Sequence, residues 1–136
     1  VNARSNNGGT GNHYALSLAN NTSLTEDYNN YYAPGLGGTL ASYGSVDKTT
    51  LATLQSANSK DAHSLNADPL FRDTTSTAAT GLRVNNYTLA GTTIAGFATD
   101  FAGISRNGTA PSMGAFETNT LSIIIFIIRS ETFSIN

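Results

Sequence analysis

The sequence has 136 residues, about the length of one domain, which is enough chain for one small core. Charged residues make up 12% of it and the formal net charge is -2, so the chain offers no basic surface for nucleic acid. Because it contains no cysteine, disulfide frameworks and thiolate metal sites are excluded. Asn, Thr, Ser and Gly must cover the surface instead, and we take this as typical of secreted β-proteins.

The first predicted element is a strand at HYALSLAN, residues 13–20. Tyr14, Leu16 and Leu18 alternate there with smaller side chains, which is the period of a half-buried strand. The stretch that follows, residues 23–35, is rich in Asn and Asp and ends in Pro-Gly. Its composition predicts turns.

Three tyrosines lie in that turn-rich stretch: Tyr28, Tyr31 and Tyr32. One interpretation makes them stacking residues for a sugar. The other packs their rings on the body of the protein and leaves their hydroxyls in water. We favour the second and keep the first as a hypothesis.

A single helix is predicted, between residues 47 and 58. Asp47 is the expected N-cap, and Leu51 and Leu54 share one face. Helical periodicity ends at NSKD, residues 58–61, and an extended stretch containing Asp68-Pro69 follows.

The C-terminal half is predicted to contain a loop at 74–80 and two strands, around 82–90 and 92–98. Near the end, LSIIIFII at 121–128 is intensely apolar but too short for a membrane-spanning helix, which needs about 20 residues. It is predicted to be a buried or intermolecular strand. Short strands separated by Asn/Gly turns, without a hairpin signature, favour a solenoid of parallel strands, with a β-sandwich as the competitor.

Four segments occur in a characteristic order: EDYNNYYAPG, LASYGSVDKTTLATLQS, KDAHSLNADPLF and TDFAGISRNGTAPSMGAFE. In this the chain resembles the C-terminal end of secreted right-handed parallel β-helix proteins, the pectate-lyase-like proteins of Bacteroidetes that include the choice-of-anchor Q type. The closing motif of that family is matched by Asp100, Gly103, Arg106, Pro111, Gly114, Ala115, Phe116 and Glu117.

The resemblance implies a mainly β fold: the C-terminal coils of a right-handed parallel β-helix, with one short helix in an inserted loop. Residues 1–117 would form this β-helix segment, and residues 118–136 an apolar tail that forms a strand. A β-helix that begins at Val1 would leave its first coil open. We therefore expect preceding coils, or another copy of the chain, to cover that end.

The closing motif carries the densest group of charges, with two interpretations. Asp100 and Glu117 could form the carboxylate pair of a glycosidase, which needs carboxyl groups about 5 to 9 Å apart. Alternatively, Arg106 ties these carboxylates and nearby carbonyls together as a scaffold. Because the resemblance puts the motif at the structural end of the domain, we predict the scaffold.

A second group, Asp61, His63 and Asp68, could form an acid–base or metal cluster. Metal sites need three or more converging ligands, and only one histidine lies near. We therefore predict a carboxylate that orients a half-buried histidine, with Asp68-Pro69 as a structural element, and no metal or cofactor. Asp73-Thr74-Thr75 resembles the O-glycosylation pattern of Bacteroidetes, which makes Thr74 a hypothetical glycosylation site.

The sequence thus predicts a secreted or cell-surface segment with a structural or carbohydrate-binding role and no active site of its own. Its partner would be a polysaccharide or a cell-surface glycan, because polar and aromatic β surfaces can hydrogen-bond and stack on sugars. Neither nucleic acid nor a membrane span is expected. Two alternatives stay open: the C-terminal part of a polysaccharide lyase or glycosidase whose catalytic coils lie upstream, and an adhesin or fibre subunit that assembles through β edges.

Overall fold

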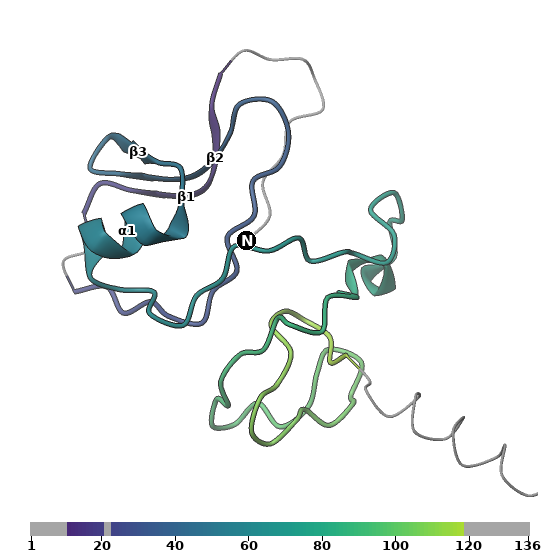
Figure 1. The fold of residues 1–136 in the computed structure, drawn as a ribbon. Helices are drawn as coiled ribbons and strands as arrows, with labels where there is room; N and C mark the ends of the chain where they lie inside the picture. Colours follow the sequence, from purple (N-terminus) through teal and green to yellow (C-terminus); the bar gives the residue numbers. More distant parts are fainter. Residues whose placement is uncertain (1–10, 21–22, 119–136) are drawn as a thin grey trace, which may run out of the picture.

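The computed structural model describes residues 11–20 and 23–118. Its elements are β1 (His13–Leu18), β2 (Gly38–Tyr43), β3 (Val46–Lys48), the helix α1 (Leu51–Asn58) and one 3₁₀ turn, η1 (Ala79–Leu82). The strands form one sheet in the order β1-β2-β3, with β1 and β2 parallel and β2 and β3 antiparallel. Figure 1 shows this sheet with α1 at one end of the molecule and the loops of residues 84–118 at the other.

A two-residue turn joins β2 to β3. Gly44 and Ser45 have φ angles of 59° and 64°, and positive φ at both central positions is what a type I′ hairpin turn requires. The turn reverses the chain, so β3 runs back along β2 with Ala41 opposite Lys48. This hairpin is the feature that the sequence interpretation did not expect.

The helix α1 begins with a capping box. Thr50 is the N-cap: its hydroxyl accepts a hydrogen bond from the backbone N–H of Thr53, whose hydroxyl in turn accepts one from the N–H of Thr50. The predicted helix is confirmed, but the predicted N-cap is wrong. Asp47 lies in β3, where it accepts hydrogen bonds from Tyr14 Oη at 2.9 Å and Asn12 Nδ2 at 3.0 Å.

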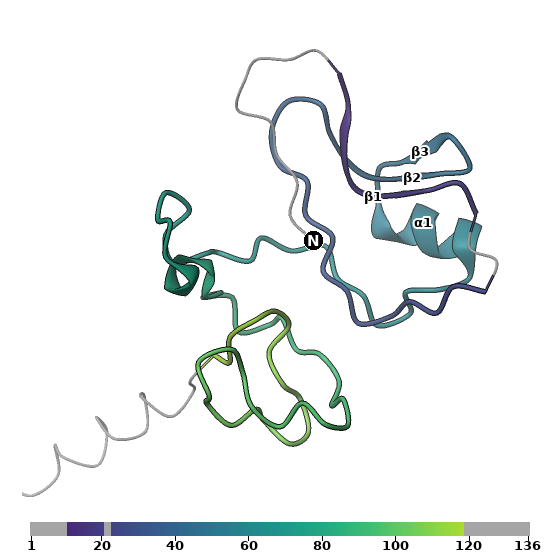
Figure 2. The same cartoon turned by 180° about the vertical axis from the view of Figure 1, so that it is seen from behind.

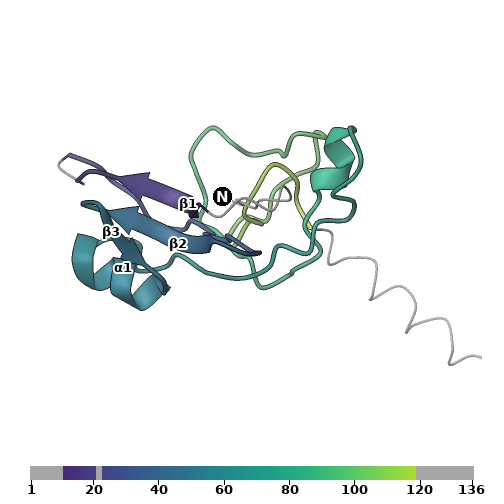
Figure 3. The same cartoon turned by 90° about the horizontal axis from the view of Figure 1, so that it is seen from above.

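The main core lies between the sheet and α1, which packs against β2 and β3. It consists of Ala15, Tyr31, Leu40, Ala41 and Leu54, with Leu16, Ala33, Tyr43 and Leu51 partly buried around it. Figure 2, the view from behind, and Figure 3, the view from above, both show α1 next to the strands of the sheet. The predicted strand at 13–20 is confirmed as β1. Its residue in this core is Ala15.

Residues 69–118 are held mainly by turns. The isolated bridges are Phe71 with Val84, Ala90 with Ser112 and Thr99 with Ser105, all antiparallel. Three apolar side chains are buried there: Val84, Leu89 and Phe116. Phe101 meets Phe116 edge-on at 5.7 Å, and the Arg83 guanidinium lies 4.6 Å from the Phe116 ring centre.

The predicted fold class is therefore wrong. A right-handed parallel β-helix would show many parallel strands in successive coils, whereas the described residues contain one three-stranded mixed sheet and one helix. The Gly44-Ser45 hairpin makes the sheet mixed. The strands predicted at 82–90 and 92–98 are absent from the described chain. In the first, the side-chain oxygen of Asn86 takes up the backbone N–H of Thr88, and in the second, the N–H of Phe97 turns back to the carbonyl oxygen of Ile94, so neither N–H is available to a strand ladder.

The apolar stretch at 121–128 and nearly all of the predicted tail, 118–136, lie outside the described residues. Within 11–20 and 23–118, none of the helices has the length and apolar character needed to cross a membrane.

Candidate functional site

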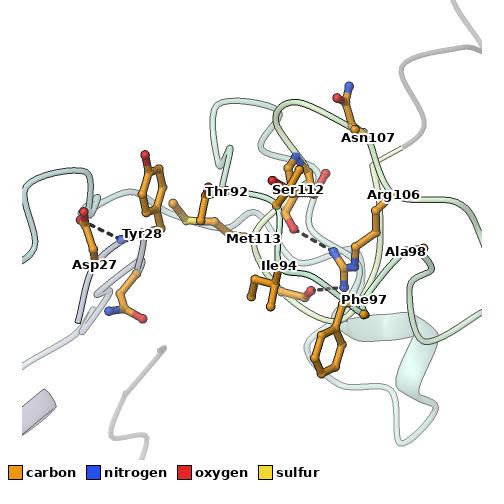
Figure 4. Close-up of a pocket in the computed structure, with 17 residues that line it drawn as sticks. Asp27, Tyr28, Thr92, Ile94, Phe97, Ala98, Arg106, Asn107, Ser112 and Met113 are labelled. Atoms are coloured by element: carbon orange, nitrogen blue, oxygen red, sulfur yellow. Dashed lines mark hydrogen bonds between the residues drawn. The ribbon is translucent and has the colours of Figure 1, made fainter. Parts of the chain in front are cut away.

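A groove of about 520 Å³ lies between the turn at 27–29 and the loops at 91–98 and 106–114. This volume is within the usual range for small-molecule sites. Figure 4 places Tyr28 on one side, Arg106 and Phe97 on the other, and Thr92 and Met113 between them. The groove is lined by Asp27, Tyr28, Asn29, Gly91, Thr92, Thr93, Ile94, Gly96, Phe97, Ala98, Arg106, Asn107, Gly108, Pro111, Ser112, Met113 and Gly114.

The Tyr28 wall is fixed by a neighbouring histidine and carboxylate. Tyr28 has a φ of 52°, an uncommon conformation for a bulky residue, and its N–H donates to Asp27 Oδ1 at 2.9 Å. The His63 ring stacks on the Tyr28 ring with centres 4.7 Å apart and planes 8° apart. His63 Nδ1 lies 2.7 Å from Asp27 Oδ2, and the His63 N–H donates to Asp27 Oδ1, also at 2.7 Å. The ring that borders the groove is thus backed by a second ring.

These contacts also set the charge of Asp27. The side-chain bond from His63 lowers the pKa of the Asp27 carboxyl, helped by the backbone N–H groups of His63 and Tyr28. Asp27 is therefore ionised throughout the neutral range, and its carboxylate is already held by its neighbours.

The opposite wall is built around Arg106. Its guanidinium donates to the carbonyl oxygens of Ser112, at 3.1 Å, and Gly114, at 2.9 Å. It also lies 3.5 Å from the carboxylate of Glu117, which is buried. Arg106 thereby ties the loop at 112–114 to the end of the described chain, as a planar fork donor can.

Asp100 and Glu117 are both buried, and backbone donors occupy both carboxylates. Asp100 accepts from the N–H groups of Ala102, Ile104 and Glu117 at 2.8 to 2.9 Å. Burial raises the pKa of Asp100, but these N–H bonds, with that of Glu117 the largest, outweigh burial and hold the pKa below its ordinary value. Glu117 accepts from the N–H groups of Asn107 and Ser112. These contacts give both acids a structural explanation.

The glycines and the proline of the closing motif shape its turns. Gly103 and Gly114 have φ angles of 79° and 105°, which favour glycine. The buried Pro111 accepts a hydrogen bond from the N–H of Gly91 at 2.7 Å. The motif therefore forms one connected unit that carries a wall of the groove.

Asp61 does not line the groove and is buried beside the main core, at 1% exposure. It accepts hydrogen bonds from Tyr31 Oη at 2.9 Å, Ser64 Oγ at 2.7 Å and Asn58 Nδ2 at 3.0 Å. Burial, with the Asp61 carboxylate beside it, raises the pKa of Tyr31. Tyr31 is thus a core residue and does not reach a ligand on the surface.

The structure does not bring Asp61, His63 and Asp68 together. His63 pairs with Asp27 and its side chain is 60% exposed, whereas Asp68 accepts from Tyr32 Oη at 2.9 Å and from the N–H of Leu70. Within the described ranges, no three His, Cys, Asp or Glu side chains gather as metal ligands would.

Two further residues named from the sequence, Pro69 and Thr74, do not line the groove. Pro69 is buried and its carbonyl oxygen accepts from the N–H groups of Asn85 and Asn86. Thr74 is exposed on a turn that Asp73 closes by accepting from the N–H groups of Thr75 and Ser76.

Several groove residues were not singled out from the sequence, among them Thr92, Phe97 and Asn107. Their segments are separated from Tyr28 by more than sixty positions, and short polar loops carry no periodic signal. Phe97 could have been noticed from the sequence, because it is an aromatic residue in a Gly-containing loop. In the structure it is 67% exposed.

Comparisons of the chain with models of known protein families, with curated proteins and with solved structures find no match.

Proposed function

We propose that this chain is a glycan-binding segment of a secreted or cell-surface protein and that the groove beside Tyr28 holds the sugar. The observation that carries the proposal is the lining of the groove. It combines exposed ring and aliphatic surface with neutral hydrogen-bonding side chains, which is the mixture that a sugar, with its apolar C–H faces and its hydroxyls, requires.

The apolar part of the lining supports stacking. Phe97 is largely exposed, so a sugar that covers its ring removes apolar surface from water. The Tyr28 ring is held by the stacked His63 and by the Asp27 hydrogen bonds. A ring that is already fixed loses little side-chain entropy on binding.

The polar part of the lining has free hydrogen-bonding capacity. Thr92 and Thr93 are exposed, and within the described part of the chain their hydroxyls make no hydrogen bond. Asn107 uses its Oδ1 atom to hold Thr109 and Ala110, which leaves its Nδ2 atom as a donor. These groups can pair with sugar hydroxyls without breaking an existing contact.

The test is the affinity of the whole chain for oligosaccharides after truncation of one groove ring. Phe97→Ala is expected to weaken binding about tenfold or more, about 1.4 kcal/mol, because it removes a stacking surface. Leu36→Ala is the matched control, since Leu36 is also exposed but does not line the groove. Tyr28→Asn is a second variant, because Asn tolerates the positive φ at this position.

Calorimetric titration against a panel of hexasaccharides measures these affinities, and thermal unfolding checks that each variant is folded. Equal affinity of the wild-type chain, Phe97→Ala and folded Tyr28→Asn for every bound sugar would contradict the proposal. Absence of binding to the whole panel would contradict it as well.

A further inference from the structure

We infer that the groove selects neutral glycans and rejects polysaccharides made of uronic acids. This inference rests on the proposed function and narrows it to one class of ligand. It follows from what the charged side chains of the groove already contact.

Arg106 is the one cationic side chain among the residues that line the groove. Both terminal nitrogens of its guanidinium donate to carbonyl oxygens, those of Ser112 and Gly114. The Glu117 carboxylate lies 3.5 Å from it. Its charge is therefore balanced within the fold, and a ligand carboxylate could pair with Arg106 only by breaking contacts that hold the loop at 112–114.

Asp27 is the other ionised side chain of the lining. Because its pKa is lowered, chiefly by the bond from His63, it carries a negative charge at neutral pH. A uronate carboxylate in the groove would meet this like charge. His63 stacks on Tyr28 behind the groove, and Asp27 already occupies its Nδ1 atom.

The remaining walls offer no compensation for a buried anion. They consist of apolar surface such as Ile94, Phe97 and Met113, and of neutral donors such as Thr93 and Asn107. A carboxylate that leaves water for such surroundings loses hydration without gaining a cation. A neutral sugar presents only hydroxyls and C–H groups, which these walls can satisfy.

The experiment compares neutral hexasaccharides of glucose, xylose, mannose and galactose with the hexamers of galacturonate and guluronate. Titration of the whole chain at pH 7.5, with EDTA and then with added Ca²⁺, gives each affinity. The wild-type chain is expected to bind at least one neutral hexamer at least about tenfold more tightly than either uronate hexamer.

A gain-of-charge variant tests the electrostatic reason. Thr92→Lys places a cation in the groove, and Thr92→Gln is its neutral control of similar length. Thr92→Lys is expected to bind the galacturonate hexamer at least about tenfold more tightly than Thr92→Gln does, and added salt should weaken that binding.

The outcomes separate the two claims. If the wild-type chain binds a uronate hexamer as tightly as the best neutral one, with or without Ca²⁺, the selectivity is wrong and the glycan-binding function stands. If no hexamer of either kind binds, the proposed function fails and the selectivity fails with it. A Thr92→Lys variant that gains no affinity for galacturonate would overturn the electrostatic explanation.

Discussion

At the scale of single residues, two carboxyl groups meet at the Asn58 amide beside the main core, the buried Asp61 and the partly buried Glu26. Asp61 accepts hydrogen bonds from Tyr31, Ser64 and Asn58. Glu26 shares the Asn58 amide with it at 3.1 Å. Burial, and then the nearby charge of Asp61, raise the pKa of Glu26 above its ordinary 4.5.

The raised pKa gives a prediction for Glu26→Gln, which keeps an oxygen for Asn58 but carries no charge. A carboxyl with a raised folded-state pKa contributes stability that is present below the ordinary value and is lost as pH rises through the folded value. The variant should therefore be more stable than the wild-type chain at pH 7, and the difference should shrink toward about pH 4. Urea unfolding at both pH values measures this. A variant that is less stable at pH 7 would show that the charge of Glu26 is favourable.

At the scale of elements, short-range side-chain contacts decide where strands and helices stop. Asp73, Asn86 and Asn107 each use Oδ1 to accept the N–H two residues further on. Such turns divide residues 69–118 into loops. β1 and α1 were predicted correctly, because hydrophobic periodicity governs them. The strands predicted in 82–98 were wrong, because the apolar residues there suggested strands but side-chain turns formed instead.

The hairpin was missed for a specific reason. A two-residue Gly-Ser connection between β-forming residues is a recognised hairpin signal, and Gly44-Ser45 is such a pair. The prediction recognised no hairpin signature in the chain, so this pair was not used. The error in fold class follows from it, because a hairpin at this point is incompatible with a sheet of parallel strands alone.

Gly38, the first residue of β2, gives an element-scale prediction. A Cβ atom there would lie 2.1 Å from the carbonyl oxygen of Ala33, and this contact is with backbone. Gly38→Ala should therefore destabilise the chain by about 1–3 kcal/mol. Gly108→Ala is the control, since its Cβ would have no heavy atom within 4 Å. Urea unfolding of both variants measures the difference, and equal stability would contradict the structure around β2.

At the scale of the whole molecule, the groove is assembled from segments that no local sequence pattern connects. Tyr28 was named from the sequence as one of three tyrosines, and only the fold distinguishes it from the buried Tyr31 and from Tyr32, which is paired with Asp68. The lyase and fibre alternatives stay predictions. The expectation that upstream coils cover an open end rested on the β-helix, which the mixed sheet replaces.

The measurement that tests the glycan groove most directly is a nuclear magnetic resonance titration of the isotope-labelled chain with the neutral hexasaccharide that binds best. Saturable shifts should concentrate in the backbone N–H groups of the segments 27–29, 92–97 and 107–114, which contain most of the residues that line the groove. The chemical shifts of the amides in α1 and β3 should not change. Saturable shifts confined to the sheet and α1, with the groove amides unmoved, would contradict the account.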